Sequence, residues 1–167
     1  MGDDDDAALS DMLRHLDVAS PHDLQEGSPE VVQFLSEIAA VLNTLAVSDF
    51  GGRIGAVRQE GLVEHVIGAA LQRFGDVDPH PGAFGKAAML LRGITAGHPF
   101  QDGNKRTGFL LATFYLEQVG HSLPEHLSVE SAEALSLAIS AGTLRDVEEI
   151  TRQLEALWQP EEGCHEH

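Results

Sequence analysis

The residues best suited to chemistry lie together in one short stretch, residues 98–108. It holds a histidine, a carboxylate, an amide and two cations, at His98, Asp102, Asn104, Lys105 and Arg106. An apolar run follows at once, which is typical of a buried helix. The first N–H groups of a helix have no partner within it, and the helix dipole adds about half a positive charge there. A polar loop that opens a buried helix can therefore bind an anion such as phosphate.

Each part of this loop suits one part of a phosphate-transfer reaction. Gly103 has no β-carbon, so the backbone can approach a phosphate closely. The N–H groups of residues 103–106 could then hold phosphate oxygens. Asp102 is an oxygen ligand suited to Mg²⁺, which needs only one or two protein carboxylates beside phosphates and water.

The remaining side chains supply charge and a base. Asn104 either donates to a phosphate or positions the loop, Lys105 offers a point charge, and Arg106 matches two phosphate oxygens. The imidazole of His98 can accept a proton from a substrate hydroxyl at neutral pH. Phe100 is expected to anchor the loop in the core.

The charge distribution points to the same region. The chain has 27 acidic and 10 basic residues and a formal net charge of −17, which argues against nonspecific binding to nucleic acid or anionic lipid. Residues 82–110 nevertheless contain four bases (Lys86, Arg92, Lys105 and Arg106) and one acid, a net charge of +3 in a chain that is otherwise −20. A positive island in an acidic protein suggests a site for a small anion.

Helical spacing of apolar residues dominates the rest of the chain, and no segment shows sustained β alternation. Ser28-Pro29 predicts a helix start, and Ser128 predicts the cap of another helix that runs to residue 141. Further helices are expected over 62–74 and 84–96, the latter capped by Gly97. Thr143 with Asp146 resembles a capping box that starts a last helix, to about residue 158.

These elements predict an all-α, compact single domain of about six or seven helices, over residues 28–158. Residues 1–27 read as a poorly specified acidic head, with one short helix expected at 7–16, and 159–167 as a disordered tail. The tail includes Cys164, which cannot form an internal disulfide. Neither a secretory signal nor an apolar stretch long enough to span a membrane is apparent, because charges or glycines interrupt each one, so a cytoplasmic protein is expected.

The stretch from His98 to Arg106 resembles the signature of the Fic/Doc family, a histidine-x-phenylalanine-x-acid-x-asparagine-x-arginine core. The ending Asn104-Lys105-Arg106-Thr107 resembles the Doc branch, named for a death-on-curing toxin. The likeness covers roughly residues 30–157 and implies the helical Fic/Doc fold, with ATP as co-substrate and Mg²⁺ held by Asp102. It assigns His98 the activation of a Ser, Thr or Tyr hydroxyl on a target protein.

Two departures bear on which group is transferred. Fic enzymes that transfer AMP usually carry a glycine at the position of Lys105 and a second arginine at the position of Phe109. The resemblance to Doc implies instead that ATP binds in the reversed sense and that its γ-phosphate is transferred. The branch's known target is elongation factor Tu. Phosphoryl transfer is therefore favoured; AMP transfer and a catalytically idle, partner-binding fold are the alternatives.

Control is expected to come from a separate protein. Many Fic proteins are held inactive by a Ser/Thr-x-x-x-Glu-Gly/Asn helix, but Glu26-Gly27 has His22 at the Ser/Thr position, and residues 151–156 end in alanine. The resemblance to Doc implies a separate antitoxin, and a disordered antitoxin segment that folds into a groove would suit this role.

Overall fold

The computed structural model describes residues 27–48, 57–73 and 76–159. Within these residues it is entirely helical apart from loops and isolated bridges, as the sequence predicts. The six helices are α3 (Pro29–Ser48), α4 (Leu62–Leu71), α5 (Ala83–Gly97), α6 (Asn104–Gln118), α7 (Val129–Ser140) and α8 (Val147–Trp158). The expected helix at 7–16 and residues 160–167 of the expected tail lie outside the described residues.

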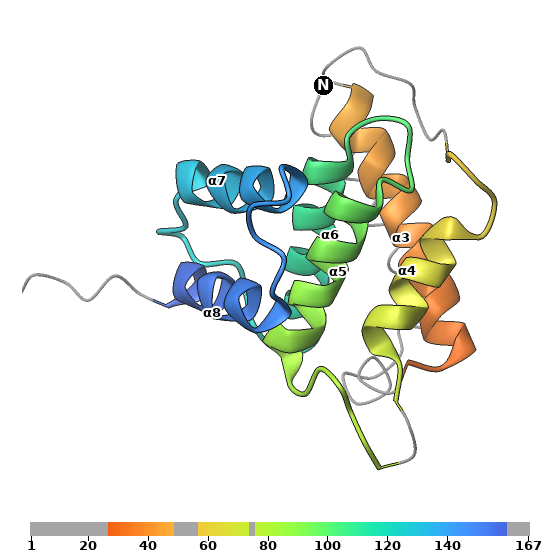
Figure 1. Cartoon of the computed structure of the whole chain (residues 1–167), viewed down its shortest axis with the longest axis horizontal. Coiled ribbons are helices and arrows are strands. Elements are labelled where there is room, and N and C mark those ends of the chain that lie inside the picture. The colour runs from red at the N-terminus through yellow and green to blue at the C-terminus, as the bar shows by residue number, and fades with distance from the viewer. Residues whose placement is uncertain (1–26, 49–56, 74–75, 160–167) are drawn as a thin grey trace, which may run out of the picture.

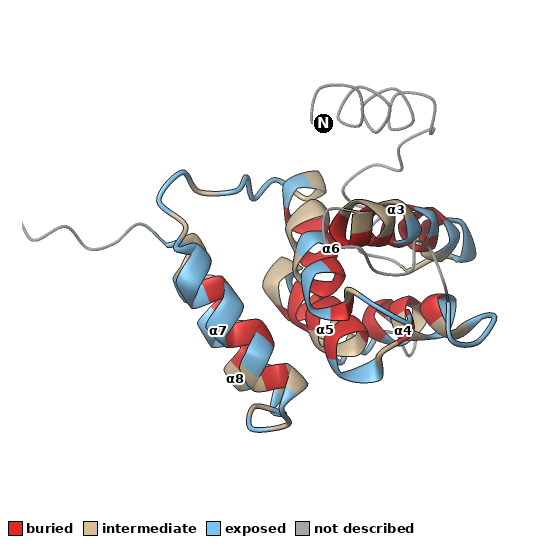
Figure 2. Cartoon of the chain, turned by 90° about the horizontal axis from the view of Figure 1, so that it is seen from above, coloured by how far each residue is buried: buried red, intermediate tan, exposed pale blue. Residues whose placement is uncertain are grey.

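Helices α5 and α6 form the centre of the bundle, with α3 and α4 on one side and α7 and α8 on the other (Figure 1). Buried residues gather where α3, α4, α5 and α6 meet (Figure 2). The α5–α6 contact is close because Gly108 lies against α5: a β-carbon there would come within 2.5 Å of Thr95 Oγ1 and 3.1 Å of the Leu91 carbonyl oxygen. The helix that opens with the polar loop is thus held in the core.

Two of the predicted helix starts are confirmed by hydrogen bonds. Ser28 Oγ accepts from the backbone N–H of Val31 at 3.3 Å, and Ser128 Oγ accepts from that of Ser131 at 3.2 Å. Each bond satisfies an N–H group that the helix itself leaves unpaired. The local sequence therefore sufficed to place these two ends.

The predicted capping box at Thr143 is wrong. Helix α8 begins at Val147, and Thr143 belongs to the end of α7, where its N–H and its hydroxyl both donate to the Ala138 carbonyl. Gly142, with φ +78°, provides the left-handed turn that lets the chain close on α7 in this way. Thr143 therefore takes part in the glycine-containing end of α7 instead of capping the start of α8.

The long helix α3 corrects the expectation about membrane spans. By length and composition alone it could cross a bilayer. It packs against α4 and α6, and half of its most apolar window is buried inside the protein. The apolar character of α3 is therefore explained by its place in the core.

Candidate active site

His98 closes α5 in an unusual backbone conformation. Its φ and ψ are 47° and 53°, and it is the only non-glycine residue with positive φ in the described part of the chain. The prediction that Gly97 caps α5 is wrong, because Gly97 is still helical and His98 makes the left-handed turn, donating its N–H to the Ile94 carbonyl at 3.2 Å. Left-handed residues other than glycine concentrate where function demands a fixed geometry. The half-buried imidazole of His98 therefore stands at a defined turn between α5 and the loop.

Asn104 ties this loop into a closed turn. Its Oδ1 accepts from the Phe100 N–H at 3.0 Å, and its Nδ2 donates to the Phe100 carbonyl at 2.9 Å. Phe100 is itself 1% exposed, which confirms that it anchors the loop in the core. The sequence left two roles open for Asn104, donating to a phosphate or positioning the loop. Both of these side-chain contacts position the loop.

A residue that the sequence did not single out supports the loop from below. Asn43, in α3, is fully buried and donates through Nδ2 to the Asp102 carbonyl at 2.7 Å and to Thr107 Oγ1 at 3.1 Å. In the sequence, the one indication that Asn43 has a special role is that a polar residue stands within the apolar face of α3, between Leu42 and Ala46. Only the packing of α3 on α6 shows what this amide does.

The upstream segment also reaches the loop. Val57 forms an isolated antiparallel bridge with Phe100, and Arg58 donates its N–H to the Pro99 carbonyl at 2.8 Å. The guanidinium of Arg58 donates to the His98 carbonyl at 3.4 Å. The segment that precedes α4 thus pairs with the backbone beside His98.

The predicted anion-binding residues meet at the start of α6. Gly103 adopts the left-handed conformation (φ 74°) that precedes the helix, and Thr107 N donates to the Gly103 carbonyl at 2.9 Å to make the first helical bond. The N–H groups of residues 104–106 precede that bond and are therefore the ones a helix leaves for a ligand. Asp102, Lys105 and Arg106 are exposed around them.

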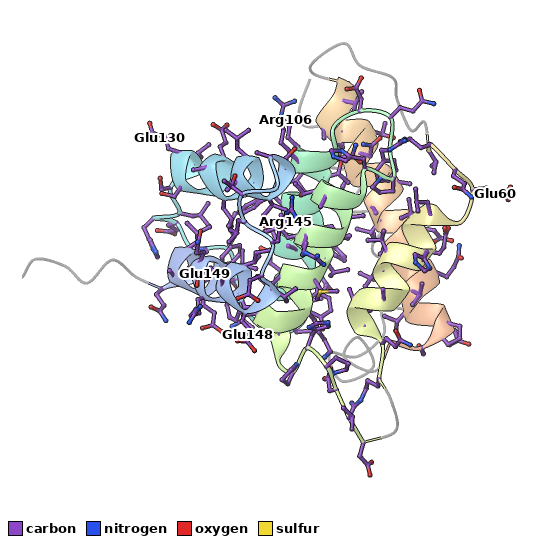
Figure 3. All side chains as sticks on the ribbon, in the orientation of Figure 1. Glu60, Arg106, Glu130, Arg145, Glu148 and Glu149 are labelled. Atoms are coloured by element: carbon purple, nitrogen blue, oxygen red, sulfur yellow. The ribbon has the colours of Figure 1, made fainter. Side chains whose placement is uncertain are left out.

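Figure 3 shows Arg106 at this end of the bundle, away from Glu148 and Glu149 of α8. One of its guanidinium nitrogens reaches the Ala46 carbonyl of α3 at 3.5 Å. The side chain that is expected to bind phosphate therefore also contacts the helix that carries Asn43.

A groove of about 510 Å³ begins at these cations and runs between α6 and α7. Its lining is mostly apolar and consists of Lys105, Arg106, Phe109, Leu110, Leu127, Val129, Ala132, Glu133, Ser136 and Leu137. The volume is within the range of small-molecule sites, which are typically apolar with a few polar groups. Phe109 forms part of this wall and also packs on Trp158, with ring centroids 6.2 Å apart, so it is partly turned toward the core.

The positive island inferred from the sequence is divided in space. Lys86 is 1% exposed and pairs with Asp78 Oδ2 at 2.5 Å and with the His80 carbonyl at 2.8 Å. These contacts are at the start of α5, whereas His98 follows its other end, and a helix of 15 residues spans about 20 Å. Lys86 therefore lies far from the predicted anion site at the start of α6. Burial first, and then the charge of Lys86, lower the pKa of His80.

Asp102 is the predicted metal ligand. No group of three or more potential ligands (His, Cys, Asp or Glu) occurs among the described residues, which argues there against a cage built from protein side chains alone. One exposed carboxylate beside an anion-binding helix start is the arrangement that Mg²⁺ uses when phosphates and water supply its other ligands. The residues present therefore fit Mg²⁺ brought in with a nucleotide.

Replacing Gly103 with alanine tests how tightly the loop is fitted. A β-carbon there would lie 2.7 Å from Val47 Cγ2 and 3.3 Å from Asn43 Nδ2, at a φ that residues with a β-carbon rarely adopt. We expect Gly103→Ala to lower the free energy of unfolding by about 1–3 kcal/mol and to weaken nucleotide binding, measured by urea titration and by calorimetry. Gly120→Ala is the control, because its φ is also positive (+100°) but nothing lies within 4 Å of the added carbon. Equal binding losses in both variants would contradict a specific fit at Gly103.

Comparison with known proteins supports the resemblance to the Fic/Doc family that the motif indicates. The model of the Fic/DOC family matches residues 32–116, about half of the chain, from the first turn of α3 to near the end of α6. A protein of Mycolicibacterium smegmatis named Toxin Doc is 35% identical over 86 residues, which are 52% of this chain and 65% of the toxin. The match thus covers slightly less than two thirds of that relative's length. With the motif loop, its buried helix and this family match together, the chain belongs to the Fic/DOC family.

Proposed function

We propose that this protein is a Doc-like toxin that transfers the γ-phosphate of ATP to a hydroxyl side chain of a target protein. The observation that carries the proposal is one loop in which a histidine, a carboxylate and the open start of α6 are held together. His98 is at the left-handed turn, Asp102 is exposed in the loop, and residues 104–106 begin α6. A base, a metal ligand and an anion site are the parts that phosphoryl transfer requires.

In the proposed reaction His98 takes the proton of the target hydroxyl as its oxygen attacks the γ-phosphorus. The new P–O bond forms while the bond between the γ-phosphorus and the bridging oxygen breaks, and ADP leaves. The amides at the start of α6, with Lys105 and Arg106, bind the charged phosphate oxygens. Mg²⁺, held through Asp102, would neutralise further phosphate charge.

The groove between α6 and α7 supports a nucleotide as the co-substrate. It continues from Lys105 and Arg106, and its remaining wall is mainly apolar, as suits a base and ribose. The position of Phe109 favours phosphate over AMP transfer. The resemblance implies a second arginine at this sequence position in AMP-transferring Fic enzymes, whereas here a phenylalanine lines the groove, so the proposed site has one arginine fewer for phosphate.

AMP transfer remains the second candidate, because His98, Asp102 and Arg106 would serve both reactions. In that case the hydroxyl attacks the α-phosphorus and pyrophosphate leaves. A binding protein without activity is less favoured, since it would need neither the open helix start nor the exposed carboxylate. As a toxin the protein would act in the cytoplasm, with elongation factor Tu as the first target to test and a separate antitoxin as its inhibitor.

The decisive experiment is to incubate the purified protein, Mg²⁺ and ATP with elongation factor Tu and to weigh the intact target by mass spectrometry. We expect the addition of one phosphoryl group, and its loss when Arg106 is replaced by alanine, because binding of the phosphates is weakened. Addition of an adenylyl group would overturn phosphate transfer in favour of AMP transfer. Without either product, the same measurement on proteins from a cell lysate tests whether another target exists.

A further inference from the structure

We propose that Asn43 is a positioning residue that holds Asp102 and the first turn of α6 in the geometry needed to bind a magnesium-bound nucleotide. The inference rests on the proposed function and extends it to a residue outside the motif. Asn43 lies 59 positions before Asp102 in sequence, so no local backbone preference can create this contact. It is a tertiary contact between α3 and the loop.

The bond to Asp102 fixes the orientation of one peptide plane. In a trans peptide the C=O and N–H groups point in opposite directions. Asn43 Nδ2 binds the Asp102 carbonyl at 2.7 Å, and therefore the N–H of the next residue, Gly103, is turned away from α3. A flip of this plane would reverse that N–H and change the backbone angle ψ of Asp102, the proposed metal ligand.

The second bond extends the support into α6. The same Nδ2 donates to Thr107 Oγ1 at 3.1 Å, and both Asn43 and Thr107 are fully buried. The amide thus bridges the residue before Gly103 and the residue that makes the first helical bond of α6. Its two contacts bracket the amides at residues 104–106 that the proposal assigns to phosphate.

A simple packing role does not account for an amide at this position. Asn43 Oδ1 is buried and has no hydrogen-bond partner among the described atoms, and burying such an oxygen is unfavourable. A leucine has the same branching and number of side-chain heavy atoms, and it would carry no buried polar atom without a partner. Ser36 provides the contrast on the same helix, because it is also buried but donates only to the Val32 carbonyl of its own helix.

The test compares Asn43→Leu, which keeps the number and branching of the side-chain heavy atoms but removes the donors, with Ser36→Ala as the matched control. We measure ATP binding by calorimetry at a series of Mg²⁺ concentrations, together with the melting temperature. Residues that orient a metal ligand typically contribute 10- to 100-fold to metal affinity. We therefore expect Asn43→Leu to raise the Mg²⁺ concentration for half-maximal ATP binding about tenfold, and Ser36→Ala to leave it within twofold. A value within twofold of wild type in Asn43→Leu would overturn the proposal.

Hydrogen exchange tests the role of Asn43 independently of the proposed function, because the measurement needs no nucleotide. In the full-length protein we expect the Thr107 amide of Asn43→Leu to exchange about tenfold faster, while that of Ala132, at the start of α7, keeps its rate. Local loss with no ATP binding by the wild type would retain Asn43 as the residue that orders the loop, but would reject the proposed function and with it a part for Asn43 in nucleotide binding. Equal loss at both amides, or at neither, would reject the positioning role.

Discussion

Replacing His98 with asparagine is expected to lower the rate of target modification by roughly 100- to 10,000-fold, the usual contribution of a general base. Asparagine cannot take the hydroxyl proton at neutral pH, but it tolerates the left-handed backbone that His98 adopts. The fold should therefore persist, with ATP affinity within a few-fold of wild type. The measurements are the initial rate of label transfer from γ-labelled ATP, calorimetry and thermal unfolding.

His65→Asn is the matched control, because His65 is an exposed histidine of α4 outside the motif loop. It should keep the wild-type rate. A toxin should also slow growth when overexpressed, and His98→Asn should relieve that effect whereas His65→Asn should not. If His98→Asn retained full activity in a folded protein, another group would have to be the base.

The second large effect is expected at the other end of α5, on stability. Removing the Asp78 carboxylate leaves Lys86 buried without its charged partner, and breaking a buried ion pair typically costs 3–5 kcal/mol. The side chain of Asp78 is still 20% exposed, so water can partly replace it, and we expect Asp78→Ala to lose about 3 kcal/mol. Urea unfolding gives this difference in the free energy of unfolding.

Two further variants identify the cause of that loss. Asp76→Ala removes an exposed acid from the same loop and should change stability by less than about 0.5 kcal/mol. Adding Lys86→Met to Asp78→Ala should restore most of the loss, because no unpaired charge then remains in the core. If the double variant is as unstable as the single one, lost loop packing rather than the buried charge is responsible.

The same pair predicts how stability depends on pH. Burial raises the pKa of Asp78, but the hydrogen bond and charge of Lys86 outweigh it and hold the pKa below the usual 3.8. A carboxyl with a lower pKa in the folded state stabilises the protein fully above its unfolded pKa, and loses that contribution as pH falls through the folded value. Below about pH 4 the wild type should therefore lose stability more steeply than Asp78→Ala.

Much of the fold could be predicted because its determinants are local. Ser28 and Ser128 each lie three residues before the N–H they bind, and the apolar spacing of each helix is a property of that helix alone. The failures at Gly97 and Thr143 are also local, where two end signals competed within a few residues. At both places the hydrogen bonds to carbonyls of the preceding helix, from His98 to Ile94 and from Thr143 to Ala138, determine where that helix ends.

The candidate site also has features that the sequence could predict and features that only the packing of the helices shows. The types and spacing of His98, Asp102 and Arg106 are legible in the sequence, and so are the family and the proposed chemistry that they carry. The sequence could not show that Lys86 lies at the opposite end of α5 or that Asn43 supports Asp102. Lys86 and the motif cations fall in one sequence window, but the length of α5 separates them in space. Asn43 and Asp102 are far apart in the chain, but the packing of α3 brings them together. The sequence by itself therefore determined which groups could react, whereas the packing of α3, α5 and α6 decided which of them share a site and what holds them there.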